Sequence, residues 1–249
     1  MTAAPEPEPE PVTRTAPRRV RRAVLTQQWR DVAFLHWPVD PAAVGALLPA
    51  GLRPDTLDGR CYVGLIALRI VRTGVLGGPG LPYLGSMAET NVRLYSVDGQ
   101  GRRGVVFRSM DASRLVPALA GRWAAGLPYT WSRLRVRRDG DLRTYTARRR
   151  WPGRRGGSSA VTIRVGAPIT APTALDDFLT ARWALHVPGR DRTRFWPNEH
   201  AAWPLHRAEV EHLADELVGA AGVALPDGPP ASVLWSPGLR VRFGPREPG

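Results

Sequence analysis

The chain has 249 residues, of which 43% are hydrophobic, and a formal net charge of +13. This length is enough for one domain with a sizeable core. The longest uncharged stretch, residues 73–88, is interrupted by Gly and Pro, so its composition excludes a transmembrane helix.

The N-terminal segment alternates Pro and Glu in PEPEPEP and then turns basic. A secretory signal has the opposite order, with positive charge before an apolar run. Proline favours extended, solvated backbone, so we expect residues 1–23 to be a disordered tail. Residues 24–249 are expected to form a single domain, located in the cytoplasm.

Strand patterns dominate the rest of the chain. The turn sequences DGQG (98–101) and RDGD (138–141) are typical of hairpins and predict antiparallel neighbours. We expect strands near residues 30–37, 60–72, 89–97, 104–111, 129–138, 142–150, 158–165, 203–211 and 231–243.

Helices are fewer, and each has a recognisable start. Asp40 precedes Pro41 in DPAAVGALLP, Ser113 precedes RLVPALAGRW, and Thr173 with Asp176 forms a capping-box pair. A last helix is expected over residues 214–222. The pattern predicts an α+β fold with a curved antiparallel sheet and helices at its edges.

All 35 basic residues are arginine, and ten of them lie between residues 133 and 155. Alternation with Leu134 and Val136 predicts an exposed strand face. A nucleic-acid site would need stacking aromatics or a groove-reading motif beside the arginines, and neither is visible. Nucleic-acid binding is therefore kept as the weaker alternative.

Sequence motifs for metals and nucleophilic catalysis are largely missing. Cys61 is the single cysteine and lies in an apolar strand, which predicts a buried thiol in a reducing compartment. Glu209 and His212, with His200 and His206 upstream, have a spacing that suits a metal only on a helix. We expect neither a metal nor a cofactor.

One predicted strand carries an unusual polar face. Glu89, Asn91, Arg93 and Tyr95 alternate with Thr90, Val92, Leu94 and Ser96, which places the first four side chains on one side. A solvated sheet face would give the same alternation. Asn and Glu are poor strand formers, however, and a long Gly/Pro-rich loop precedes them. The residues leave both interpretations open.

Three blocks resemble a known family: HWPVDPAAVGALLPAGLRPDTLDGRCYVGL (36–65), ETNVRLYSVDGQGRRGVVFRSMDA (89–112) and GLPYTWSRL (126–134). They look like the YqjF-like family, a domain of unknown function in the acetoacetate decarboxylase-like superfamily. Residues 203–222 and 234–244 continue the similarity more loosely. The resemblance implies a bent sheet that closes into a pseudo-barrel around a pocket, with the Glu89 strand facing inward.

The decarboxylases of that superfamily use a lysine as Schiff-base nucleophile in a Gly-aromatic-Pro-Lys setting. The similar block here is Gly126-Leu127-Pro128-Tyr129, and the chain contains no lysine. Arginine does not form a catalytic imine at neutral pH. Schiff-base decarboxylation is therefore excluded.

A pocket without lysine can still bind or transform a small carboxylate or carbonyl compound. We assign catalytic roles to Glu89, as acid or base, and to Tyr129, as donor to a developing enolate. Arg93 would hold a carboxylate, with Asn91 and Tyr95 completing the substrate contacts. The predicted function is a lysine-independent lyase or isomerase, and the alternative is a non-catalytic ligand-binding protein.

Overall fold

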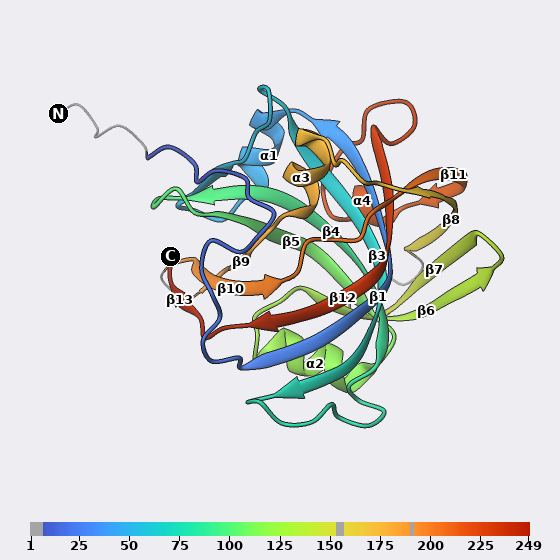
Figure 1. Ribbon diagram of the computed structural model, residues 1–249, viewed down its shortest axis with the longest axis horizontal. Coiled ribbons are helices and arrows are strands. Elements are labelled where there is room, and N and C mark those ends of the chain that lie inside the picture. Colours follow the sequence, from blue (N-terminus) through green and yellow to red (C-terminus); the bar gives the residue numbers. More distant parts are fainter. Residues whose placement is uncertain (1–6, 153–156, 190–191) are drawn as a thin grey trace.

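The computed structural model describes residues 7–152, 157–189 and 192–249, and its ribbon is shown in Figure 1. Four short helices lie outside a large sheet: α1 Pro41–Leu47, α2 Leu115–Trp123, α3 Ala174–Thr180 and α4 Leu217–Ala220. The strands are β1 Leu25–Val39, β2 Leu52–Pro54, β3 Cys61–Val75, β4 Met87–Asp98, β5 Arg103–Ala112, β6 Tyr129–Asp139, β7 Leu142–Trp151, β8 Ser158–Pro168, β9 Ala184–Val187, β10 Arg194–His200, β11 His206–Asp215, β12 Ser232–Phe243 and β13 Glu247–Pro248.

Nine of the described strands close into a ring. The order β5-β6-β7-β8-β11-β12-β1-β3-β4 returns to β5, because β4 and β5 also pair. This closed sheet confirms the predicted curved α+β architecture. The sheet is mixed rather than purely antiparallel, since β5 runs parallel to β6 and to β9.

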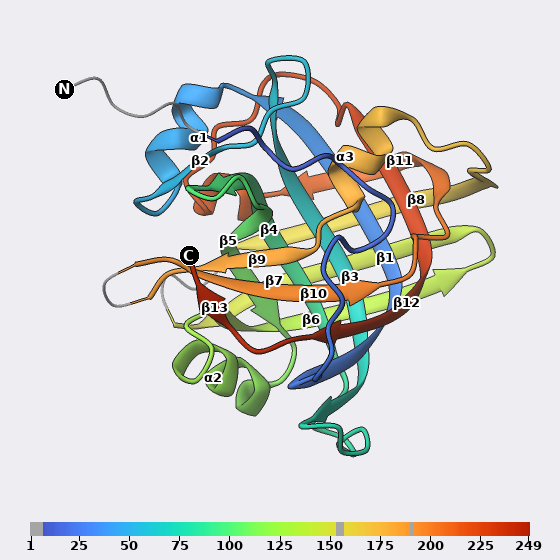
Figure 2. The same ribbon diagram turned by 60° about the vertical axis from the view of Figure 1, so that its left-hand side comes forward.

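A second, smaller ring shares a wall with the first. Strands β9 and β10 pair with each other and connect β5 to β12, so β12, β1, β3, β4 and β5 belong to both rings. Figure 2 shows β9 and β10 crossing in front of β3 and β4. The shared strands are therefore covered on both faces, and β3 is buried continuously from Cys61 to Leu68.

Each ring has its own apolar core. Leu35, Val92 and Ile163 belong to the core of the nine-strand ring, which α1 and α4 also contact. Phe178 and Trp196 belong to the core of the smaller ring. Successive β4 side chains point alternately into the two cores, which removes the solvated face that an ordinary antiparallel sheet would have.

The predicted helix starts are confirmed in two cases. Asp40 accepts a hydrogen bond from the Ala42 N–H, and Thr173 and Asp176 form the reciprocal capping box of α3. Helix α2 instead begins after Arg114 without a side-chain cap, and α4 is short because β11 continues to Asp215. No helix of the described residues is both long and apolar enough to cross a membrane.

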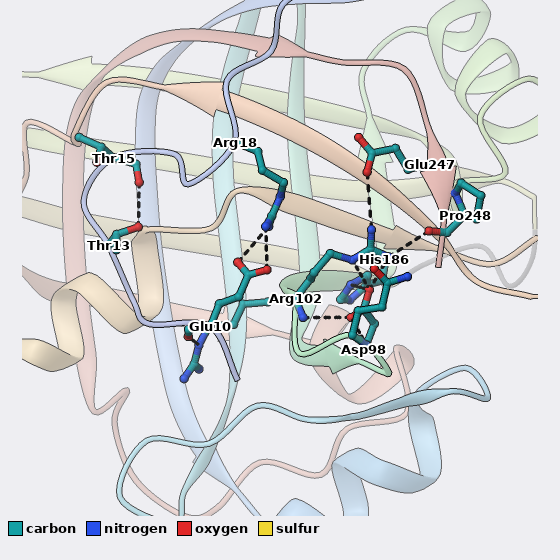
Figure 3. Close-up of polar contacts among 11 residues, drawn as sticks. Glu10, Thr13, Thr15, Arg18, Asp98, Arg102, His186, Glu247 and Pro248 are labelled. Atoms are coloured by element: carbon teal, nitrogen blue, oxygen red, sulfur yellow. Dashed lines mark hydrogen bonds and ion pairs between the residues drawn. The ribbon is translucent and has the colours of Figure 1, made fainter. Parts of the chain in front are cut away.

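Residues 7–23 lie against the barrel, which differs from the solvated tail that we expected. The Glu10 N–H donates to the Gly101 carbonyl, the Trp183 indole donates to the Thr13 carbonyl, and Val20 is buried. Figure 3 shows Arg18 paired with Glu10, an ion pair with an N–O distance of 2.7 Å. Glu10 and Arg18, which we expected to be solvated, therefore form an ion pair with each other.

Candidate functional site

A cavity lies inside the smaller ring, bounded by β1, β3, β4, β5, β9, β10 and β12. Its volume is about 60 Å³, whereas one water needs roughly 10–15 Å³ on the same measure. The walls are mostly apolar, with polar side chains contributed mainly by β4. Its lining residues are Leu25, Gln27, Trp29, Val32, Phe34, Ile66, Leu68, Ile70, Glu89, Asn91, Arg93, Phe107, Met110, Leu127, Tyr129, Leu185, Trp196 and Phe243.

Glu89 is a buried carboxyl group in this cavity. Its Oε2 accepts a hydrogen bond from the Tyr129 hydroxyl at 2.8 Å, and its Oε1 accepts one from Asn91 Nδ2 at 3.0 Å. Burial raises the pKa of Glu89 to about 7, although these two hydrogen bonds act in the opposite direction. The group can therefore release or accept a proton near neutral pH.

Tyr129 reaches the cavity from the first residue of β6. Gly126 precedes the strand in the left-handed region, with φ of 65°, and lets the chain turn from α2 into β6. Gly121 on α2 leaves room for the ring, since a Cβ there would lie 2.4 Å from Tyr129 Cδ2. Burial and the neighbouring Glu89 raise the pKa of Tyr129 well above its ordinary value, so the phenol remains a proton donor.

Arg93 is a buried cation with only 8% of its surface exposed. Its Nη2 donates to the Leu179 carbonyl at 2.8 Å, and its Nε donates to the Tyr95 hydroxyl at 3.1 Å. It forms no ion pair with any residue in the described part of the chain. Because buried charges are normally paired, this guanidinium suits an anionic ligand.

Tyr95 lies behind Arg93 and does not line the cavity. Its hydroxyl donates to the Leu179 carbonyl at 3.0 Å and lies 2.7 Å from His36 Nε2, so it accepts from His36 and from Arg93. Burial, then Arg93 and Arg182, holds the pKa of His36 well below its usual value. A neutral His36 with its proton on Nε2 fits these contacts, which place the Tyr95 hydroxyl against His36 and Arg93.

The structure brings together Glu89, Asn91, Arg93 and Tyr129 as cavity-lining residues. The sequence did not predict the residues that surround and position these side chains. A Cβ at Gly64 would lie 3.0 Å from His36 Nε2 and 3.3 Å from Arg93 Cγ, so this glycine makes room for both side chains. These contacts join distant parts of the chain, and local periodicity carries no signal for them.

The other polar clusters lie away from the cavity. Glu209 and His212 are exposed on β11, and no group of three His, Cys, Asp or Glu residues in the described ranges is arranged to hold a metal. Ser96 Oγ lies 2.8 Å from His186 Nδ1, and His186 Nε2 lies 3.7 Å from Asp98. This resembles a catalytic triad, but all three residues are buried, and Arg102 binds Asp98 as Figure 3 shows.

The arginine-rich segment forms two kinds of contact. Arg138, whose side chain is about half exposed, pairs with the buried Asp31, and the largely buried Arg149 pairs with the buried Asp111. The exposed arginines of β6 and β7 also include Arg133, Arg135, Arg137, Arg148 and Arg150, of which the alternation predicted the first three. Arg143 is half-buried, and its guanidinium carbon lies 5.1 Å from a Trp235 ring centroid. Residues 153–156, which include Arg154 and Arg155, lie outside the described residues.

Comparisons with solved structures agree with this architecture. An acetoacetate decarboxylase-like enzyme from Sphingomonas wittichii RW1 is 18% identical, with a TM-score of 0.59 over 91% of this chain and 94% of that chain. Acetoacetate decarboxylase from Legionella pneumophila is 14% identical, with a TM-score of 0.59 over 94% and 91%. The enduracididine biosynthesis enzyme MppR, complexed with pyruvate, is 18% identical, with a TM-score of 0.60 over 94% and 92%. At these identities the likeness establishes the fold.

Sequence relatives establish the family. The uncharacterized protein YqjF of Bacillus subtilis (strain 168) is 30% identical over 208 residues, which span 83% of this chain and 85% of that protein. The DUF2071 family, an uncharacterized conserved protein (COG2071), matches residues 26–240. The chain therefore belongs to the DUF2071 family and has an acetoacetate decarboxylase-like fold.

Proposed function

We propose that the cavity binds a small organic anion with a carbonyl group and that Glu89 and Tyr129 transfer protons to and from it. The proposal rests on the environment of Arg93. It is buried, it lines the cavity, and it has no ion-pair partner within the described residues. A ligand carboxylate would supply the missing counter-charge and could accept two parallel hydrogen bonds.

The chemistry of the remaining cavity groups supports a carbonyl on the same ligand. Glu89 can remove a proton from the carbon beside that carbonyl. Tyr129, whose hydroxyl donates to Glu89 in the free protein, would turn that O–H to the ligand oxygen that becomes negative. Proton abstraction of this kind begins isomerisation, dehydration and some carbon–carbon cleavages. No imine is needed, which agrees with the absence of lysine.

Two further observations support the proposal. The related fold of MppR is known in complex with pyruvate, a small molecule that has both a carboxylate and a carbonyl. The mostly apolar walls of the cavity lower the local dielectric, which strengthens electrostatic contacts inside it.

We also propose that the protein works in the cytoplasm. Its single cysteine, Cys61, is buried as a free thiol, which suits a reducing compartment.

Arg93→Met should weaken binding of pyruvate, used as a probe, by about 10- to 100-fold, because a charge-assisted contact is removed. Isothermal titration calorimetry gives the affinity of each protein. Arg108→Met is the control, since Arg108 is partly buried and donates to the Leu47 and Ala221 carbonyls outside the cavity. Equal pyruvate affinity in the wild type and in Arg93→Met would contradict the anchor role.

Pyruvate affinity should fall as the pH rises through about 7. The pKa of Glu89 is raised to about 7, so above this pH the carboxylate adds a second negative charge to the cavity. Linkage then predicts that Kd increases by up to about tenfold per pH unit. Titrations from pH 5.5 to 8.5 measure the effect, and a profile that stays flat in the wild type would show that Glu89 does not ionise beside the ligand.

Native mass spectrometry of freshly purified protein is the direct route to the natural ligand. A co-purifying small carboxylic acid that Arg93→Met no longer retains would identify the substrate class. A co-purifying molecule without an anionic group would contradict the proposed class.

A further inference from the structure

Exposed apolar side chains gather at one end of the molecule. All the large hydrophobic residues that are exposed in the described ranges fall in segment 75–84, in segment 115–123 or at Trp151. Leu76 is 73% exposed and Trp123 is 75% exposed. We call these three segments the apolar end. Large exposed apolar patches on a folded protein indicate a binding surface.

The three segments form one continuous surface. The guanidinium carbon of Arg114 lies 3.5 Å from the ring centroid of Tyr83, and Arg114 Nε donates to the Ser86 carbonyl. This joins the β3–β4 loop to the start of α2. Trp123 and Trp151 line the same surface groove. In Figures 1 and 2 the loop and α2 both lie at the lower end of the barrel.

The β3–β4 loop has a defined structure that holds its apolar side chains in solvent. The Thr73 N–H donates to the Gly85 carbonyl at 2.9 Å, and the Leu81 N–H donates to the Thr73 carbonyl at 2.8 Å. Leu76 and Tyr83 have positive φ angles of 52° and 53°, which are unfavourable for bulky residues. Both residues therefore combine an unfavourable backbone conformation with an exposed apolar side chain. Burial of these side chains against a bound partner would offset that cost in free energy.

Exposed arginines surround the apolar end. Arg72 on β3 and Arg148 and Arg150 on β7 are exposed and form no ion pair with the described residues. The guanidinium carbon of Arg150 lies 4.9 Å from the centroid of a Trp131 ring, beside the groove. The surface therefore combines an apolar centre with a cationic rim, and its partner should be apolar and anionic.

We propose that the apolar end is a docking surface for a membrane that contains anionic phospholipids. Aliphatic tips such as Leu76 would enter the acyl boundary, while Tyr83, Trp123 and Trp151 would lie at headgroup level. Rim arginines would face the lipid phosphates. Such docking is peripheral and is independent of the function proposed for the cavity.

Other partners fit the surface less well. In a symmetric pair of chains the same patch meets itself, which would bring the Arg148 and Arg150 rims close to like charges. Single-stranded nucleic acid would stack on the tryptophans but would leave Leu76 and Val116 without favourable contacts. An anionic bilayer satisfies the aliphatic, aromatic and cationic groups together.

Vesicle co-sedimentation tests the proposal. The full chain should bind vesicles of equal parts phosphatidylcholine and phosphatidylglycerol, should bind phosphatidylcholine alone about tenfold or more weakly, and should lose affinity as salt is raised. The double variant Arg148→Ser/Arg150→Ser should lower the partition coefficient by about tenfold or more, since each arginine near an anionic surface contributes about fivefold. Leu76→Ser/Trp123→Ser should lower it similarly by removing apolar insertion.

Arg60→Ser is the matched control, because Arg60 is exposed beside Cys61, at the opposite end of β3 from Val75. Its partition coefficient should stay within about twofold of the wild-type value, because a charge farther from the membrane than the Debye length contributes little to binding. Vesicle selectivity of the wild type needs no variant, so it tests the proposal even if a substitution prevents folding.

Three results would overturn the proposal. The first is equal or absent binding of the wild type to both kinds of vesicle. The second is a dimer in light scattering that Leu76→Ser/Trp123→Ser converts to a monomer without vesicle binding, which would assign the surface to a second copy. The third is binding of an oligothymidylate, but not of vesicles, that Arg148→Ser/Arg150→Ser abolishes, which would assign the surface to nucleic acid.

Discussion

Glu89→Gln should lower kcat for the substrate of the cavity by about 10²-fold or more, because a glutamine amide cannot accept and return a proton. The substitution keeps the shape of the side chain and can keep a hydrogen bond to Tyr129, so ligand binding should change much less than turnover. Steady-state kinetics on the substrate found by mass spectrometry gives kcat and KM separately.

The stability of the same variant checks that Glu89 is protonated in the fold. Burial raises the pKa of Glu89 from its ordinary value of 4.5 to about 7. A folded-state pKa above the unfolded value gives stability that is present below pH 4.5 and is lost as the pH rises through 7. Glutamine cannot ionise, so Glu89→Gln should melt at a higher temperature than the wild type at pH 8 and show little gain at pH 5.

Two outcomes would change the interpretation of Glu89. Full turnover in Glu89→Gln would remove its catalytic role. Unchanged binding of a ligand that the wild type never converts would favour the alternative from the sequence, a ligand-binding protein without turnover. Tyr129→Phe helps to separate these cases, since loss of the enolate donor should lower kcat while leaving the Arg93 anchor in place.

Asp55→Ala should destabilise the protein by about 3–5 kcal/mol, because it removes one partner of a buried charge cluster. Asp55 is 1% exposed and pairs with Arg103 and Arg182, and Arg182 is 4% exposed. Without the carboxylate, the Arg182 guanidinium would remain buried against the Tyr95 and Phe178 rings without a counter-charge. Urea unfolding followed by circular dichroism measures the loss.

Asp141→Ala is the control for this prediction. Asp141 also pairs with an arginine, Arg164, but both side chains are about half exposed, so water replaces the lost contact. The free energy of unfolding should therefore change far less than in Asp55→Ala. Equal losses in the two variants would show that the Asp55 cluster adds no more than an ordinary surface pair.

Local sequence patterns predicted the elements that depend on local chemistry. The Asp98–Gly101 turn joins β4 to β5, and the Thr173–Asp176 pair caps α3, because each depends on residues close in the chain. Strands β9 and β10 were missed. The first has four residues, and the second contains Pro197, which normally argues against a strand.

Those two missed strands decide where the site lies. They close the smaller ring over the face of β4 that carries Glu89, Asn91 and Arg93. That face therefore lines a cavity instead of being exposed to solvent. Periodicity correctly placed Glu89, Asn91 and Arg93 on one side of a strand. It could not supply Tyr129, which the family resemblance suggested, or the Tyr95–Leu179 contacts, which join residues 84 positions apart.

The wall shared by the two rings has a consequence for protein engineering. Val92 and Leu94 pack in the nine-strand core, while their strand neighbours Asn91 and Arg93 face the cavity on the other side of the same backbone. A change of side-chain volume at Val92 or Leu94 should shift that backbone, and with it Asn91 and Arg93. In a library built to alter the cavity, these two core positions would therefore change its shape even though their side chains do not line it.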